Sequence, residues 1–330
     1  MNSTIAARPR TGAPLPRAPR VPAPGAADRP DVGSAAAAPA AAAAPAVPAA
    51  QHGFIKRYPL LVFFAIAFAI SFAGILSVVW LGGVQGAVAP TDTRFLLVML
   101  AWLAGPSVAS LVTTGLVSGR SGYRELLARL TTWRAGARWY ALALLTAPLV
   151  SLGLSYALSA FSAEFLPAIA TSTDTTGLLI TGLSYGLLGG GLMEELGWTG
   201  FAVPRLRLRH GVLGAGLIMG LLWGAYHFSV IYLMARPSGG LALWLLLPAQ
   251  LFAWLPPYRV LMVWLYDRTN SLLLAMLMHA GATASMLILQ PFGISGAMLL
   301  AYVLGLGVVY WIMVGIVAVV TRGQIARIQQ

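Results

Sequence analysis

The sequence predicts an all-α membrane protein, a polytopic bundle of about eight transmembrane helices. Of the 330 residues, 58% are hydrophobic and only 9% are charged. Uncharged runs recur that reach the roughly 20 apolar residues needed to cross a bilayer. The lipid bilayer is therefore the first expected partner. The chain contains no cysteine, so the sequence offers no disulfide framework and no thiolate metal site.

The first 52 residues have a different composition, made of Ala, Pro and Gly with scattered Arg. They contain little apolar bulk to offset the entropy of ordering a backbone, so we expect a disordered tail over 1–52 and a helical domain over 53–330. No apolar core of a signal peptide precedes Phe54, so we expect the tail to remain in the mature chain. The excess of Arg over Lys and the abundant Ala favour a bacterial source, and hence a bacterial plasma membrane.

Apolar runs from Tyr58 onward define the individual spans. The sixth is interrupted by Pro256 and Pro257, which membrane helices tolerate when neighbouring groups bond the freed carbonyls. The eight predicted spans are 59–81, 95–118, 139–161, 177–203, 211–235, 241–266, 272–290 and 296–320.

Charges in the connecting segments predict the orientation, because short cytoplasmic loops are rich in Lys and Arg. Every second connection is basic, and the alternate ones are acidic or nearly uncharged, so we expect both termini in the cytoplasm. The net charge of +12 is explained by the tail and by this membrane face. No basic strip with interleaved aromatic residues is present, so no nucleic-acid partner is expected. The basic residues used are Lys56, Arg57, Arg120, Arg124, Arg129, Arg134, Arg138, Arg205, Arg207, Arg209, Arg322 and Arg327.

The basic connection over 120–140 has its own pattern. Tyr123, Leu126, Leu127, Leu130 and Trp133 recur at three- and four-residue spacing, with Arg on other faces. This pattern is typical of an amphipathic helix. We expect an amphipathic connector that can lie among the lipid headgroups.

Two adjacent acids, Glu194 and Glu195, stand inside the fourth apolar run. A carboxylate at the bilayer centre costs roughly 2.5–3.5 kcal/mol on insertion scales, so an acid there is a candidate functional residue. At α-helical spacing Glu194 ends a stripe of glycines at 182, 186 and 190, and Glu195 is rotated by about 100° from it. In the fifth span glycines at 216, 220 and 224 precede His227. We expect the two small-residue stripes to pack together.

A third polar position lies in the seventh span, where His279 is followed one turn later by Thr283. Glu194 and His227 are equally far in sequence from a turn near His210 and Gly211. Equal rise along two helices gives similar depth, so we expect an acid and two imidazoles around one pocket in the cytoplasmic half of the bilayer.

These segments resemble the CPBP family of intramembrane proteases, also called the CAAX protease or Abi family. The family's first motif, Glu-Glu-x-x-x-Arg, then Gly-Phe and Pro-Arg-Leu, corresponds to EELGWTGFAVPRL from Glu194. The second, an aromatic residue followed by three residues and then a His, corresponds to WGAYH, with Trp223 in place of the usual Phe. The third, His-x-x-x-Asn, corresponds to HAGAT from His279. The resemblance covers about 178–289, and three ordered motifs in separate spans are fairly specific.

The resemblance implies a set of roles. Glu194 would be the general base, His227 would hold the same water, and His279 with Thr283 would form the oxyanion site. We assign Glu195 a supporting role. Glu194, His227 and His279 would also be ligands of Zn²⁺ or another divalent metal if the reaction depends on one. The sequence leaves open a metal or a bare glutamate-activated water.

Two departures from the motifs bear on activity. Thr199 stands where the family has arginine, and the nearest cation along the chain is Arg205. Thr283 replaces an asparagine. The preferred hypothesis is an endopeptidase that cuts a membrane-associated or lipidated, CAAX-like, protein or peptide. The alternatives are an impaired relative acting as a scaffold or bacteriocin-immunity-type protein, and a transporter relaying protons through the acid pair, for which no second copy of the Glu segment is found.

Overall fold

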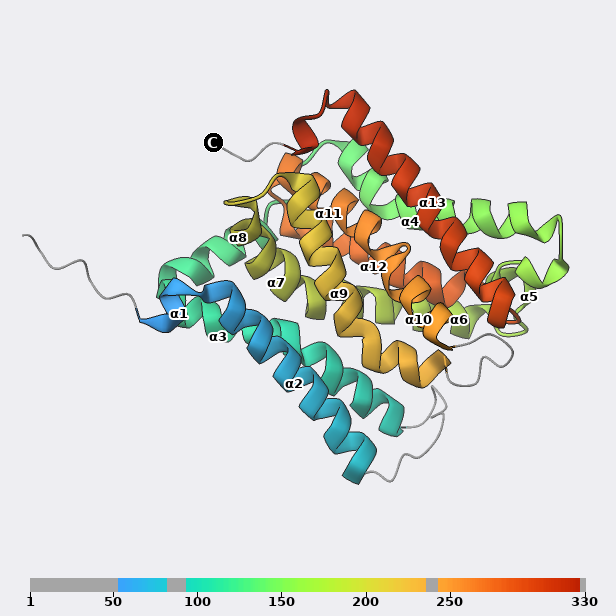
Figure 1. The fold of residues 1–330 in the computed structure, drawn as a ribbon, viewed down its shortest axis with the longest axis horizontal. Helices are drawn as coiled ribbons and strands as arrows, with labels where there is room; N and C mark the ends of the chain where they lie inside the picture. Colours follow the sequence, from blue (N-terminus) through green and yellow to red (C-terminus); the bar gives the residue numbers. More distant parts are fainter. Residues whose placement is uncertain (1–52, 82–92, 236–242, 327–330) are drawn as a thin grey trace, which may run out of the picture. The chain divides into compact units, whose positions relative to one another are not determined.

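The computed structural model describes residues 53–81, 93–235 and 243–326, and every regular element within these ranges is helical (Figure 1). The predicted all-α, polytopic class is therefore confirmed. The predicted disordered tail over 1–52 lies outside the described residues. The helices flanking the central segment are α1 (Phe54–Arg57), α2 (Pro59–Leu81), α3 (Thr93–Leu130), α4 (Ala137–Ser159), η1 (Ala163–Phe165), α5 (Ala168–Thr171), α9 (Val212–Ala235), α10 (Leu243–Phe252), α11 (Leu255–Thr269), α12 (Leu272–Ile288), α13 (Gly296–Val320) and η4 (Gln324–Ala326).

Six helical stretches of the described chain are long and apolar enough to cross a membrane, and α12 is a shorter apolar helix of 17 residues. The sixth predicted span is divided into α10 and α11. Pro256 and Pro257 lie in the first turn of α11, where a missing backbone N–H leaves no hydrogen bond unmade. The count of eight spans and the orientation of the termini stay predictions.

The amphipathic connector is shorter than predicted. Helix α3 bends at Gly119, whose φ of 57° and ψ of −143° are outside the helical region, and only residues up to Leu130 continue as helix. Tyr123 and Leu127 are exposed as expected, but Leu126 and Arg129 are buried. This part of the segment therefore packs on the protein with one face instead of lying wholly among headgroups.

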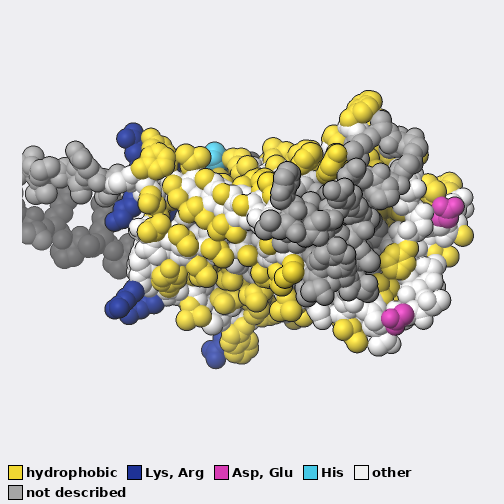
Figure 2. All heavy atoms as spheres, turned by 90° about the horizontal axis from the view of Figure 1, so that it is seen from below, with side chains coloured by type: hydrophobic (Ala, Val, Ile, Leu, Met, Phe, Trp, Pro, Cys, Tyr) yellow, Lys and Arg dark blue, Asp and Glu magenta, His cyan; other side chains and the backbone are white. Residues whose placement is uncertain are grey.

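Charged side chains gather at opposite ends of the face shown in Figure 2. Lys and Arg side chains lie at one end, Asp and Glu at the other, and the surface between is mainly hydrophobic. Large apolar side chains are exposed on other helices as well, such as Leu149 on α4 and Val308 and Ile316 on α13. A hydrophobic belt between polar ends is what a membrane-spanning bundle requires.

The central segment is one continuous helical run with two unusual stretches. It begins at Asp174, whose carboxylate accepts a hydrogen bond from the N–H of Gly177 (2.8 Å), a standard helix N-cap. Two π-helical stretches interrupt it, and three consecutive glycines at 189–191 offer no β-carbon to oppose the wider turn. The segment consists of α6 (Thr175–Tyr185), η2 (Gly186–Glu194), α7 (Glu195–Gly197), η3 (Trp198–Ala202) and α8 (Val203–Arg207).

The wider turn changes which glutamate follows the glycine stripe. In a π-helix the backbone bonds join residues five apart, so the residue that succeeds Gly190 on the face toward α12 is Glu195. Glu194 turns toward α9 instead. The prediction that Glu194 ends the glycine stripe assumed α-helical spacing and is wrong for this reason.

The two glycine stripes pack on different neighbours, contrary to the prediction that they pack together. A β-carbon placed on Gly186 would lie 2.6 Å from the carbonyl oxygen of Ala280 in α12. One placed on Gly220 in α9 would lie 2.5 Å from Cα of Pro256 in α11. Both glycine stripes allow close helix contact, but the stripe of the central segment packs on α12 and the stripe of α9 packs on α11.

Helices α11 and α12 form a tight hairpin. Asn270 adopts the left-handed conformation at the end of α11, with φ of 48°. Ser271 then caps α12 by accepting a hydrogen bond from the N–H of Leu274 (3.2 Å), and its own hydroxyl donates to the carbonyl of Thr132 (2.6 Å). This turn places the inner parts of α11 and α12 side by side against the central segment.

Candidate active site

The indole of Trp223 in α9 is the centre of the candidate site. Its Nε1–H donates to Oε2 of Glu194 at 2.9 Å. The ring lies edge-on to His279, 4.9 Å between centroids, and to His227, 5.3 Å between centroids. One side chain therefore contacts the acid and both imidazoles that the sequence singled out. These residues come from η2, α9 and α12, as three separate spans predicted.

Glu194 is held by two indoles. Oε2 accepts a second hydrogen bond from Nε1–H of Trp198 at 2.8 Å, and the carboxylate residue is only 2% exposed. Trp198 is itself fixed because its ring packs edge-on against Phe63 (5.7 Å) and Tyr226 (5.1 Å). Among the described residues no hydrogen bond is found to the other oxygen, Oε1. Oε1 is therefore the oxygen of Glu194 that the two indoles leave without a hydrogen bond.

Glu195 points to a different set of partners and is fully buried. Its Oε1 accepts hydrogen bonds from NH1 of Arg259 and from Nδ1 of His279, each at 2.7 Å. Its Oε2 accepts a hydrogen bond from the hydroxyl of Thr199. The carboxylate thus orients His279 and is neutralised by a buried arginine, a geometry suited to the supporting role predicted for it.

Arg259 is the functional residue that sequence reasoning missed. It lies on α11, is 0% exposed, and its guanidinium carbon stands 4.2 Å from the centroid of the Trp223 ring. Its Nε and NH2 atoms are buried without a hydrogen-bond partner in the described part of the chain. An arginine inside a predicted span was the available signal, because intramembrane cations are costly unless they are paired.

The cation nearest in sequence, Arg205, does not serve the glutamates. Its NH1 donates to the carbonyl of Phe201 at 2.9 Å, and its guanidinium lies 3.6 Å from the centroid of that phenyl ring. The cation that pairs with Glu195 is Arg259, at 2.7 Å. Removing one partner from a buried ion pair typically costs about 3–5 kcal/mol, since the other charge is left uncompensated.

His279 and Thr283 face the same glycine. A β-carbon on Gly190 would lie 3.0 Å from Nε2 of His279 and 2.2 Å from the hydroxyl oxygen of Thr283. Because Nδ1–H donates to Glu195, the neutral ring has Nε2 as its unprotonated nitrogen. The two side chains therefore present polar atoms on one side of η2, as their spacing of one turn predicted.

His227 is half-buried and is oriented by its own helix. Its Nδ1 donates to the carbonyl of Trp223 at 2.7 Å. Its ring stands edge-on to Trp102, with 4.9 Å between centroids. Here too Nε2 is the ring nitrogen that remains for a water or a substrate group.

The donor set was tested against the possible metal. Both imidazoles use Nδ1 in a fixed hydrogen bond, which is the usual outer arrangement of metal-bound histidines. In the described ranges, however, no group of three or more His, Asp or Glu side chains is arranged to hold a metal ion. Oε2 of Glu194 is also directed at two indole N–H groups. These side chains, as they lie in the described residues, do not fit a metal ion.

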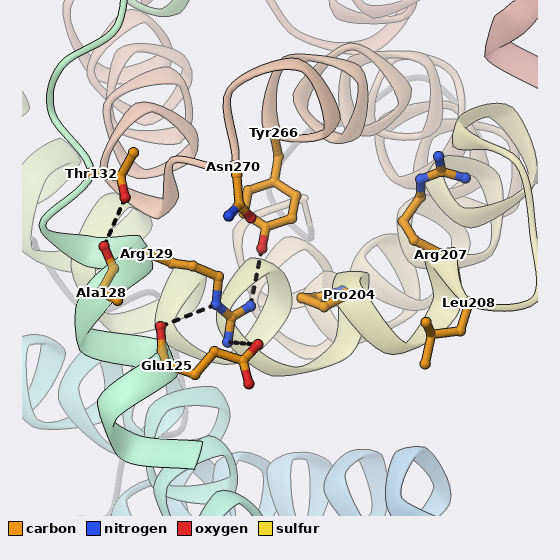
Figure 3. A pocket seen from close by; sticks show the side chains of 9 residues that line it. All are labelled: Glu125, Ala128, Arg129, Thr132, Pro204, Arg207, Leu208, Tyr266 and Asn270. Carbon is orange, nitrogen blue, oxygen red and sulfur yellow. Dashed lines mark hydrogen bonds and ion pairs between the residues drawn. The ribbon is translucent and has the colours of Figure 1, made fainter. Parts of the chain in front are cut away.

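Two cavities in the described part of the chain are lined by other residues. One, of about 340 Å³, is drawn in Figure 3, and Arg129 is among the residues that line it. The guanidinium of Arg129 donates to the hydroxyl of Tyr266 (3.0 Å) and to the carbonyl of Gly200 in η3 (3.0 Å). Arg207 also lines it and pairs with Asp267 (2.6 Å). The second, of about 260 Å³, is almost wholly apolar and lies between α4, α6 and α12. The first cavity adjoins the end of the site segment, and its buried arginine ties η3 to α3 and α11.

Comparison with known proteins bears directly on this segment. Residues 175–285 match the family model described as Type II CAAX prenyl endopeptidase Rce1-like. This part of the chain, called the Rce1-like segment below, is similar to that family. The resemblance to CAAX proteases inferred from three motifs is thereby confirmed, and the Rce1-like segment includes every predicted site residue as well as Arg259.

A curated relative is CAAX prenyl protease 2 of Methanococcus maripaludis. It is 31% identical over 84 residues, which are 26% of this chain and 28% of the relative. The match thus spans less than a third of the relative's length. It supports the family of the Rce1-like segment and leaves the activity of the whole chain to be proposed.

Proposed function

We propose that the protein is an intramembrane endopeptidase that hydrolyses a peptide bond by glutamate-activated water. The observation that supports this most is the state of Glu194. It is a buried carboxylate with one oxygen held by two indole N–H groups and the other left open. Such a carboxylate is fixed in direction yet able to accept a proton, as a general base requires.

The remaining groups supply the other parts of a hydrolytic site. His227 has Nε2 available to hold the attacking water next to Glu194. His279 and Thr283 lie where donors to a developing oxyanion are needed, and Thr283 can donate through its hydroxyl. For His279 to donate, Nε2 must gain a proton, and the carboxylate of Glu195 at 2.7 Å stabilises the charged ring that results.

The substrate class follows from where the site lies. Glu194 and its partners are in helices of the apolar belt, so the substrate must be a membrane-associated or lipidated peptide or protein, of the CAAX-like kind named for the relatives. The scaffold alternative was motivated by Thr199 and Thr283. Arg259 supplies the positive charge that is lost with threonine at position 199. The replacement at 199 is therefore a weaker reason to propose a scaffold.

The proposal is tested with Glu194→Gln, which keeps an oxygen for the two indoles but cannot accept a proton. We expect cleavage to fall by about 10²- to 10⁴-fold, the usual contribution of a general base, with insertion and thermal stability near wild type. The exposed acid Glu125 offers a matched control in Glu125→Gln. Membrane-associated peptides are compared between cells producing each form. Unchanged turnover by the Glu194 variant would reject the assignment.

A further inference from the structure

We propose that Arg259 is a positioning residue: from a different helix, it supplies Glu195 with the positive charge that the family's first motif would carry at position 199. Its catalytic consequence rests on the proposed function, whereas its structural consequence does not. Arg259 acts through Glu195 and His279 and does not itself touch the reacting atoms.

Positions 199 and 259 serve the two oxygens of one carboxylate. Thr199 donates to Oε2 of Glu195 and Arg259 donates to Oε1. The side chain at 199 therefore already points at the group that a motif arginine would pair with. Threonine retains a hydrogen bond there but gives up the charge. The guanidinium of Arg259 restores that charge at a carboxylate that is fully buried.

Arg259 also fixes the direction of His279. Oε1 of Glu195 accepts from NH1 of Arg259 and from Nδ1 of His279 at the same 2.7 Å. With Oε1 held by the guanidinium, the imidazole is held with Nδ1 toward Glu195 and Nε2 toward Gly190. Groups in this outer position are needed to keep a histidine in one tautomer and one orientation.

The surroundings select arginine over lysine. The guanidinium lies over the face of Trp223, 4.2 Å from the ring centroid, and the edge of the same indole donates to Glu194. A planar cation can stack on the ring and donate to the carboxylate at once, which an ammonium group cannot do equally well. One residue outside the motifs thus contacts Glu195 directly and Glu194 through a single indole.

The direct test records the two ring ¹⁵N shifts and the Nδ1 proton of His279 in full-length, ¹⁵N-histidine-labelled protein in lipid nanodiscs at one fixed pH. The signals are assigned by their loss in His279→Asn. We expect Arg259→Met to move both nitrogen shifts. The matched control, Arg207→Met, removes another buried arginine that pairs with Asp267 and should leave them in place. Wild-type His279 shifts in Arg259→Met would overturn the proposal.

A second measurement keeps the proposal testable if Arg259→Met accumulates poorly. Combining it with Glu195→Gln removes the charge that Arg259 is proposed to neutralise. We expect the double variant to recover most of the folded yield and thermal stability lost in the single variant. An equal loss in both would show that Arg259 acts on something other than Glu195, and would overturn the proposal.

The catalytic consequence is measured separately. We expect Arg259→Met to lower kcat by up to about 100-fold, because a misplacement of about 1 Å in a catalytic group can cost that much, with KM nearly unchanged. Should wild type cleave no membrane peptide at all, the proposed function fails, while the His279 signals and the double variant still decide the role of Arg259. An Arg259→Met enzyme with wild-type kcat but altered His279 signals would refute its catalytic consequence.

Discussion

The substitution Trp223→Phe tests whether an indole N–H, and not just an aromatic ring, holds Glu194, the proposed general base. Phenylalanine is the residue that the family's second motif usually has at this position. It preserves a ring beneath Arg259 but removes the donor 2.9 Å from Oε2 of Glu194. Both Trp223 and Glu194 are 2% exposed, so water is poorly placed to replace the bond.

The expected magnitude follows from the charge of the acceptor. A hydrogen bond to a charged group contributes about 1.5–3 kcal/mol, which is roughly 10- to 150-fold in an equilibrium or rate constant. Trp198 still holds the same oxygen at 2.8 Å. We therefore expect the lower half of that range for the loss of stability, with a comparable fall in kcat because the carboxylate is less firmly directed.

Trp264→Phe is the matched control. Trp264 is a half-buried tryptophan on α11 that packs against Trp139 at 5.4 Å, and its Nε1 has no hydrogen-bond partner in the described residues. The same atoms are deleted, but no hydrogen bond is lost. Thermal unfolding in nanodiscs and peptide cleavage are measured for both variants. If Trp223→Phe behaves like Trp264→Phe in both assays, the reasoning about the indole N–H is refuted.

Two further predictions concern packing around the site. Gly190→Ala places a β-carbon 2.2 Å from the hydroxyl oxygen of Thr283, so we expect lower thermal stability and a loss of cleavage. The control is Gly315→Ala in α13, where no atom lies within 4 Å of the added β-carbon; it should be neutral or stabilising by up to about 1 kcal/mol. Equal behaviour of the two variants would contradict the packing described at Gly190. Arg129→Met removes the hydrogen bonds to Gly200 and to Tyr266 in α11, and we expect the free energy of unfolding to fall by about 1.5–3 kcal/mol. The control is Arg124→Met, since Arg124 is exposed on the same helix; it should change stability by less than about 0.5 kcal/mol. Matching losses in the two variants would show that Arg129 is not structural.

The fold was accessible to sequence analysis because it depends on long apolar runs. Each predicted span is helical in the described residues, and the proline pair at 256–257 marks the start of α11, as the break in the sixth span suggested. The identities of Glu194, His227 and His279 were likewise accessible, because polar side chains within apolar helices are few and stand out individually.

What sequence analysis missed depends on three-dimensional winding and packing. The π-helical turns at 186–194 place Glu195 after Gly190 on the face toward α12, whereas α-helical spacing predicts Glu194 at that place. Arg129 was counted with the cytoplasmic loops, yet the bend at Gly119 turns it inward. Arg259 lies 64 residues after Glu195, so no local pattern connects the two.

The wide turns of η2 have a consequence for how sequences similar to this segment diverge. The winding of the helix directs two adjacent carboxylates to different partners. Glu194 accepts hydrogen bonds from two indoles, and Glu195 pairs with an imidazole and a guanidinium. Losing a single glycine upstream would rotate the residues that follow by about 100°, so that Glu195 takes the position of Glu194 and Glu194 turns away from it. A gap of one residue in an alignment of this segment therefore weighs more than a substitution at most of its positions.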